Sequence, residues 1–187
     1  MSAGPAIDAA RVIADLRELD RRTGGPRGAR RVAWGDEWLA ARDFLGELLG
    51  ELGLEAKRDE AGNVWARLEG SAEPALGLGS HLDSVPGGGW LDGELGVMAA
   101  MGVLRAWAGG GTQPPRTLTL IDWADEEGAR FGRSLFGSSA FSGTLDPAEL
   151  RGLEDADGSP IADVLAEGGV ELRRAPSASR HQDLLGA

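Results

Sequence analysis

An imidazole and a carboxylate stand two residues apart within residues 79–83, GSHLD. Alternate side chains of an extended chain point to the same side, so His81 and Asp83 can lie next to each other. Asp83 can then accept a hydrogen bond from one ring nitrogen of His81, which leaves the other nitrogen to bind a metal ion. A histidine paired with a carboxylate for structural reasons has the same spacing. His-x-Asp alone therefore leaves both interpretations open.

A further carboxylate follows after a glycine-rich loop at residues 86–89, and eight residues separate it from Asp83. We expect this residue, Asp92, to open a helix, so that its carboxylate lies near the strand end at which His81 projects. Gly93 leaves room for the backbone there. An aspartate that only caps the helix is the alternative.

Three adjacent carboxylates, Asp125, Glu126 and Glu127, come directly after the apolar run 117–123. Carboxylates this close repel one another unless a cation lies between them. Because Glu126 and Glu127 point in different directions, one can bind a metal while the other handles a proton. A solvated acidic turn is the alternative. Together, the three motifs at successive strand ends favour a metal site.

Two buried strands and the helix between them must position these side chains. Residues 75–79 form a small, apolar run, residues 117–123 are apolar and β-branched, and residues 92–107 are long enough for a helix. Strand, helix and strand predict a parallel unit of an α/β fold. Ligands of open α/β sheets bind at the carboxyl ends of strands, which is where the polar motifs stand.

The other N-terminal elements follow from hydrophobic spacing. Residues 5–22 and 36–52 have apolar positions at helical intervals, and we expect a helix in each. Residues 54–69 read as two short strands joined at the turn-prone triplet 61–63, which predicts a hairpin.

The C-terminal third indicates shorter helices. Asp146-Pro147 and Ser159-Pro160 each place a capping residue before a proline suited to the first helical position. Residues 175–187 show no clear period, and we predict no element there.

Composition excludes several classes of function. The 187 residues are enough for one domain with a sizeable core. The absence of cysteine removes disulfides and thiol nucleophiles and leaves any metal to His, Asp and Glu. A net charge of -11 disfavours nucleic acid and anionic membranes as partners and attracts cations. Without a long apolar run or a secretion signal, we expect a cytoplasmic protein.

Two long runs resemble a known family. Residues 79–97, GSHLDSVPGGGWLDGELGV, resemble a signature of the hydantoinase/carbamoylase family, which includes N-carbamoyl-L-amino-acid hydrolases, allantoate amidohydrolases and β-ureidopropionases and belongs to the M20-type metallopeptidase clan. Residues 125–137, DEEGARFGRSLFG, are similar to its second signature. Weaker similarity includes RRVAWGDEW and DADGSPIADVL. The short spacing before Asp92 favours the amidase branch over the clan's peptidases.

The resemblance implies roles for five side chains. His81 binds one of two divalent metal ions, Asp92 bridges both, and Glu127 binds the other. Glu126 is the general base, and Asp83 orients His81. The implied fold is a mixed, mainly parallel sheet flanked by helices, as in M20-type, phosphorylase/hydrolase-like catalytic domains.

The implied activity is metal-dependent hydrolysis of a C–N bond in a small linear amide or ureido compound. The substrate would be an N-carbamoyl-L-amino acid, allantoate or a β-ureido acid. Two ions of Zn, Mn, Co or Ni would activate a water molecule, whose proton passes to Glu126. The side chains that select the substrate are expected mostly beyond Ala187.

Family members are about twice as long, and they contribute a histidine from a His-Ile-Glu-Gln motif and another near the C-terminus. We therefore expect residues 1–187 to be the N-terminal portion of the catalytic metal-binding domain, truncated before the lid domain through which full-length relatives form homodimers. His181 does not match that motif, and we interpret it as a tail histidine. With two protein ligands per metal, the polypeptide alone should have little or no activity.

Two other functions stay open. One is an aminoacylase or exopeptidase of the wider clan. The other is a non-catalytic domain that keeps the fold and binds a metal or a partner subunit.

Overall fold

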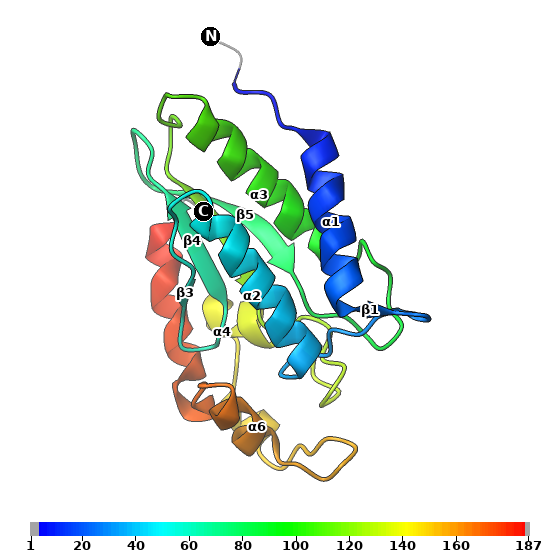
Figure 1. Cartoon of the computed structure of the whole chain (residues 1–187). Coiled ribbons are helices and arrows are strands. Elements are labelled where there is room, and N and C mark those ends of the chain that lie inside the picture. The colour runs from blue at the N-terminus through cyan, green and yellow to red at the C-terminus, as the bar shows by residue number, and fades with distance from the viewer. Residues whose placement is uncertain (1–3, 186–187) are drawn as a thin grey trace.

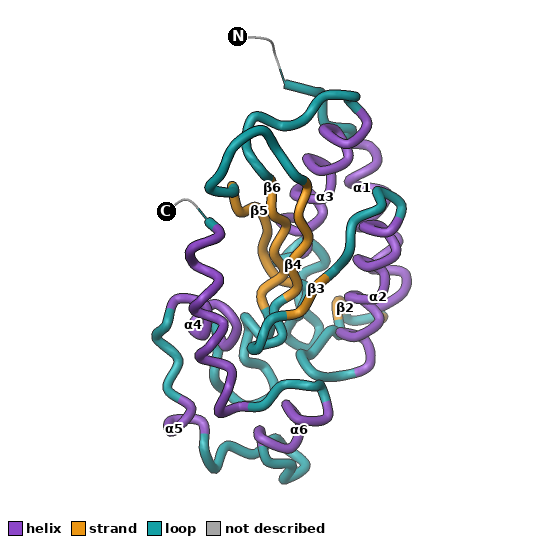
Figure 2. The backbone as a smooth tube through the Cα atoms, turned by 90° about the vertical axis from the view of Figure 1, so that its left-hand side faces the viewer, coloured by secondary structure: helices purple, strands orange, loops and turns teal. Residues whose placement is uncertain are grey.

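The computed structural model describes residues 4–185, which form three layers. A four-stranded sheet lies between helices α1, α2 and α3 on one face and α4 with the 3-10 helix η1 on the other (Figure 1, Figure 2). The α/β fold with a mixed sheet is confirmed, but one of the sheet's three strand pairs is parallel and two are antiparallel, so the sheet described here is not mainly parallel. In chain order, the elements are α1 (Ala9–Thr23), β1 (Gly24–Gly25), β2 (Gly28–Ala29), α2 (Asp36–Gly50), β3 (Lys57–Arg58), β4 (Val64–Leu68), β5 (Leu76–His81), α3 (Glu94–Gly109), β6 (Leu118–Trp123), α4 (Phe136–Ser142), α5 (Pro147–Leu150), α6 (Ile161–Glu167) and η1 (Leu172–Leu184).

The sheet has the strand order β3-β4-β6-β5. β5 and β6 run parallel, with Leu76 opposite Leu118 and His81 opposite Trp123. β4 is antiparallel to both β6 and β3, so β3 and β4 form the predicted hairpin. Because β5 and β6 are parallel and in register, they end at the same edge of the sheet.

One face of the sheet is buried by the first three helices. Val12, Leu16 and Leu19 recur at helical spacing on α1 and are buried against α2, α3 and the sheet. Each fully buried leucine of this kind contributes about 1.5–3 kcal/mol to stability. α1 begins at Ala9, four residues after the predicted start, because the Asp8 carboxylate caps the helix by accepting the N–H of Arg11 at 3.0 Å.

Aromatic rings cover part of the opposite face, and they correct the interpretation of the C-terminal segment. Trp65 of β4 lies 5.6 Å from Phe141 of α4 and 5.7 Å from the His181 ring, between ring centroids. His181 belongs to η1, so residues 172–184 are helical where the sequence predicted no element, and His181 is packed against the sheet. The histidine interpreted from the sequence as a tail residue therefore lies within a helix; residues 186–187 lie outside the described part.

The two proline signals differ in outcome. Asp146 caps α5 by accepting the N–H of Ala148 at 2.8 Å, with Pro147 at the first position, as predicted. At the second signal, Pro160 itself is the N-cap, and Ser159 donates its N–H to the Asp155 carboxylate at 2.9 Å. That helix therefore begins one residue later.

Within residues 4–185, no helix is long and apolar enough to cross a membrane.

Candidate active site

The predicted site residues stand on two loops that leave the sheet side by side. His81 ends β5 and is paired with Trp123, which ends β6. The loop carrying Asp83 and the acidic loop carrying Glu126 therefore start at neighbouring positions of the same edge. This is the arrangement that parallel strands were expected to produce.

Asp83 joins the two loops. Its side chain is buried, with 1% exposed, and its Oδ1 accepts the backbone N–H of Glu126 at 3.1 Å. Its Oδ2 accepts the backbone N–H of Glu127 at 3.0 Å. Hydrogen bonds to a carboxylate are stronger than those between neutral groups, so Asp83 fixes the position of both glutamates.

His81 lies between Asp83 and Glu126. Its Nδ1 is 3.0 Å from the Asp83 carbonyl oxygen and 3.4 Å from Asp83 Oδ1, while its Nε2 is 3.6 Å from Glu126 Oε2. Burial disfavours the charged imidazolium, but the hydrogen bond and charge of Asp83, with the charge of Glu126, raise the pKa of His81 to about 9. The ring thus faces Asp83 with one nitrogen and Glu126 with the other.

Asp92 lies in the turn before α3, which starts at Glu94 and not at Asp92 as predicted. The reason is Gly93, whose φ of +81° is not helical. A Cβ atom added to Gly93 would stand 2.5 Å from Cε1 of the His81 ring and 2.6 Å from its Nδ1. The backbone next to Asp92 therefore passes directly against His81.

The carboxylates around Glu127 are crowded. Burial raises the pKa of Glu127, and the negative charges of Asp92 and Glu126 raise it further. His81 acts in the opposite direction, because its charge lowers that pKa. Side chains from three segments, residues 81–83, Asp92 and residues 126–127, thus influence one another electrostatically.

The first carboxylate of the acidic run is buried and was not assigned a role from the sequence. Asp125 is 2% exposed and accepts the indole N–H of Trp34 at 3.0 Å. Burial raises the pKa of Asp125 to about 7, against the opposing effect of that hydrogen bond. Its carbonyl accepts the N–H of Phe136 at 3.1 Å. The family-like run RRVAWGDEW contains Trp34 and was the signal that could have identified this support.

A buried ion pair supports the ends of both strands and was also missed. Arg42 Nε lies 2.8 Å from Oδ2 of Asp122, and Asp122 Oδ1 accepts the N–H of Leu82 at 2.8 Å. Leu82 stands between His81 and Asp83. Asp122 therefore connects the end of β6 to the segment that holds the predicted metal ligand.

The donor atoms fit a divalent metal in type, because one imidazole and several carboxylates are present without cysteine. The crowded charges at Glu127 are those that a cation would relieve. Within residues 4–185, however, no group of three or more His, Asp or Glu side chains is arranged as a set of metal ligands. Among the described residues, the carboxylate that lies within 4 Å of His81 Nε2 is that of Glu126, the predicted general base, at 3.6 Å.

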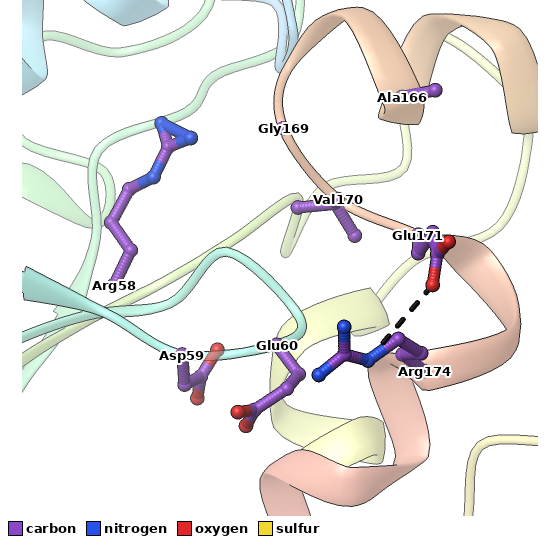
Figure 3. A pocket seen from close by; sticks show the side chains of 8 residues that line it. All are labelled: Arg58, Asp59, Glu60, Ala166, Gly169, Val170, Glu171 and Arg174. Atoms are coloured by element: carbon purple, nitrogen blue, oxygen red, sulfur yellow. Dashed lines mark ion pairs between the residues drawn. The ribbon is translucent and has the colours of Figure 1, made fainter.

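A separate cavity of about 420 Å³ lies between the β3–β4 turn and the C-terminal helices (Figure 3). Its lining includes Arg58, Glu60 and Arg174, and an ion pair joins Arg174 to Glu171 at 3.9 Å. None of the five predicted site residues lines it. The cavity is therefore distinct from the site at the strand ends.

The sequence is similar to those of known hydrolases. The model of peptidase family M28 matches residues 63–154. The N-carbamoyl-L-amino acid amidohydrolase of Geobacillus stearothermophilus is 35% identical over 170 residues, which cover 90% of this chain and 41% of that protein. The allantoate amidohydrolase of Escherichia coli is 34% identical over 84% of this chain and 38% of that protein.

Solved structures of amidases have a similar fold. A hydantoinase/carbamoylase family amidase from Burkholderia ambifaria superposes with a TM-score of 0.80 at 34% identity, over 88% of this chain and 41% of that one. An amidase of the same family from Burkholderia vietnamiensis gives a TM-score of 0.82 at 30% identity.

The fold is the one that these solved amidases have over the matched part. Over most of its length, the chain is similar to amidases of the hydantoinase/carbamoylase family. It spans about two fifths of the length of the relatives it matches, 41% of the first.

Proposed function

We propose that this chain provides the metal-binding half of an amidohydrolase active site, which hydrolyses a C–N bond in a linear amide or ureido compound. The observation that supports it best is the junction at Asp83. One buried carboxylate faces His81 and also holds the backbone of Glu126 and Glu127. The substrate would be an N-carbamoyl-L-amino acid, allantoate or a β-ureido acid, as the names of the relatives suggest.

In this proposal, His81, Asp92 and Glu127 would hold two divalent ions of Zn, Mn, Co or Ni, and Asp92 would contribute to the binding of both. Metal ions at such a site supply Lewis-acid activation of water and of the substrate carbonyl. Asp83 keeps the His81 ring in a fixed orientation through the contacts at Nδ1. Nε2, which lies 3.6 Å from Glu126 Oε2, is then the ring nitrogen left to bind a metal.

Glu126 is the general base of the proposal. Its backbone is fixed by Asp83, while its side chain is 34% exposed and can reach a water molecule. It would accept the proton of the attacking water and deliver it to the leaving nitrogen, a role that typically accelerates a reaction by about 10²–10⁴-fold. Glu127, the neighbour that interacts with Asp92, is then free to act as the ligand.

We further propose that residues 1–187 correspond to the N-terminal portion of the catalytic domain. Two protein ligands per metal ion are fewer than catalytic zinc sites have, and the affinity should be low. The polypeptide alone is then a weak hydrolase, or an inactive one.

The match to peptidase family M28 favours one second candidate, an aminoacylase or exopeptidase. A panel of N-carbamoyl amino acids, allantoate, β-ureido acids, N-acyl amino acids and dipeptides separates the two, provided that hydrolysis is measured on a full-length version of the protein with Zn²⁺ or Mn²⁺ present. Cleavage of carbamoyl or ureido compounds alone supports the amidase. Cleavage of acyl compounds or dipeptides alone supports the second candidate.

Titration calorimetry with Zn²⁺, Mn²⁺, Co²⁺ and Ni²⁺ tests the assignments within the site. We expect Asp92→Asn and Glu127→Gln to weaken metal binding, and Glu126→Gln to preserve it. Equal losses from Glu126→Gln and Glu127→Gln would contradict the division of roles. No binding by the unmodified chain would favour a non-catalytic domain.

A further inference from the structure

Two buried charged side chains lie directly beside the segments that bear His81 and Asp92. Arg31, in the loop before α2, and Glu94, the first residue of α3, form an ion pair. Their side chains are 1% and 0% exposed. Charged groups are very seldom this deeply buried, because removing them from water costs several kcal/mol per ion.

Arg31 holds both neighbours of Asp83. Its Nε donates to the carbonyl of Leu82 at 2.8 Å, and its backbone N–H donates to Ser84 Oγ at 3.1 Å. The N–H of Ser84 in turn donates to the Arg31 carbonyl at 2.9 Å. A further bond, from Nη1 to Thr23 Oγ1 at 3.0 Å, fixes the guanidinium to the end of α1. Arg31 is therefore bonded on each side of the residue that orients His81.

Glu94 holds the other segment. It follows Gly93, whose backbone lies against the His81 ring, and Asp92 precedes that glycine. Fixing Glu94 consequently fixes the start of α3 and the turn that presents Asp92. Through one ion pair, the chain before α2 connects the segment of His81 and Asp83 to the turn of Asp92.

We propose that the Arg31–Glu94 pair is a positioning element, which sets the separation between the His81 segment and Asp92 and thereby the metal affinity of the site. Stability alone does not account for such a pair, because well-packed apolar side chains of similar volume are often equally or more stabilising. The claim about metal affinity rests on the proposed function. The claim about the placement of the His81 ring does not.

The double variant Arg31→Met with Glu94→Leu separates positioning from stability. It removes both charges together, so no buried charge is left unpaired, and it removes the donor to the Leu82 carbonyl. We expect the thermal midpoint to stay near that of the unmodified chain while the metal dissociation constant rises by about 10–100-fold, the effect usual for groups that orient metal ligands. Arg31→Lys, which keeps the charge but loses the planar fork, should give a smaller loss.

Asp15→Asn is the matched control. Asp15 pairs with Arg105 of α3, with side chains 5% and 16% exposed, and so also holds α3, but at the far end from Glu94. This variant should lower the thermal midpoint and leave the metal dissociation constant unchanged.

A second readout needs no metal. The chain has two histidines, His81 and His181, so their ring signals in a ¹H–¹³C NMR spectrum are readily assigned. In the metal-free double variant and in Arg31→Lys, the His81 signals should shift while those of His181 stay in place. Asp15→Asn should move neither.

Unchanged His81 signals in a folded double variant, together with an unchanged metal affinity, would overturn the positioning claim. The same conclusion follows if Asp15→Asn shifts His81 as much as the double variant does. If the double variant does not fold, Arg31→Lys decides by the same two readouts. If the unmodified chain binds no metal, the proposed function fails, and the His81 signals alone decide whether the pair places the ring.

Discussion

The carboxylate of Asp83 accepts the backbone N–H of Glu127 at 3.0 Å, although the two residues lie on different loops, 44 positions apart. The other oxygen of Asp83 accepts the N–H of Glu126 at 3.1 Å. The residue predicted to orient His81 therefore also positions the two glutamates. One buried side chain determines how the ends of β5 and β6 face each other.

Asp83→Asn should destabilise the fold. The asparagine side chain offers one acceptor oxygen and an NH₂ donor, so it can accept from only one of the two backbone N–H groups and directs a donor at the other. We expect a loss of about 2 kcal/mol in the free energy of unfolding, measured by urea titration. Asp157→Asn, at an exposed aspartate, should change it by less than about 0.5 kcal/mol. Equal effects of the two variants would contradict the role given to Asp83.

Arg42→Ala should destabilise the chain more strongly. The guanidinium is paired with buried Asp122, donates to the Gly62 carbonyl at 2.7 Å and lies 3.7 Å from the ring centroid of Trp38. Its removal leaves the Asp122 carboxylate buried without its partner, which costs about 3–5 kcal/mol. Arg17→Ala, at an exposed arginine of α1, is the control. Denaturant midpoints that coincide for the two variants would show that the Arg42–Asp122 pair contributes nothing to the stability of the fold.

Gly93→Ala tests the close approach of the backbone to His81. Gly93 and Gly111 both have positive φ, +81° and +69°, so alanine is strained at either position. Around Gly111 a Cβ would meet nothing within 4 Å, whereas at Gly93 it would meet the His81 ring at 2.5 Å. Gly111→Ala should cost about 1 kcal/mol, and Gly93→Ala clearly more. Thermal unfolding of both variants decides, and equal losses would contradict the contact.

The hydrogen bonds to the Asp155 carboxylate should make the stability of the fold depend on pH. Its carboxylate accepts the backbone N–H groups of Ser159 and Asp157 and the Nε of Arg130, at 2.9, 3.0 and 2.9 Å. These bonds, that of Ser159 first, lower the pKa of Asp155. A carboxyl whose pKa is lower in the folded state stabilises the fold above its unfolded pKa, near 4, and loses that contribution as the pH falls further. Asp155→Asn should therefore reduce the fall in the unfolding free energy as the pH drops below about 4, measured against the unmodified chain. An unchanged slope would contradict the lowered pKa.

Local patterns were enough to predict the strands and the side chains at their ends. The apolar runs around residues 76–81 and 118–123 define β5 and β6, and a parallel pairing follows from the helix between them. His81 ends the first run, and Asp83 and the acidic run each follow two residues after the end of a run, so their proximity could be inferred without any long-range information.

Long-range pairs could not be predicted in the same way. Arg31 meets Glu94, and Trp34 meets Asp125, only after the chain has folded, and no periodicity or spacing connects residues so far apart. The exact start of α3 was missed because Gly93 adopts a positive φ next to His81. The helix η1 was missed because its residues 172–184 have little apolar character, and they are held instead by packing around Trp65.

The most direct test of the account is a crystal structure of the chain soaked with Zn²⁺ or Mn²⁺, with anomalous scattering used to locate the ions. The account predicts an anomalous peak within about 2.0–2.2 Å of a ring nitrogen of His81 and of a carboxylate oxygen of Asp92. The peak should disappear in His81→Ala. A peak elsewhere on the molecule, or none at the ends of β5 and β6, would contradict the proposed metal site.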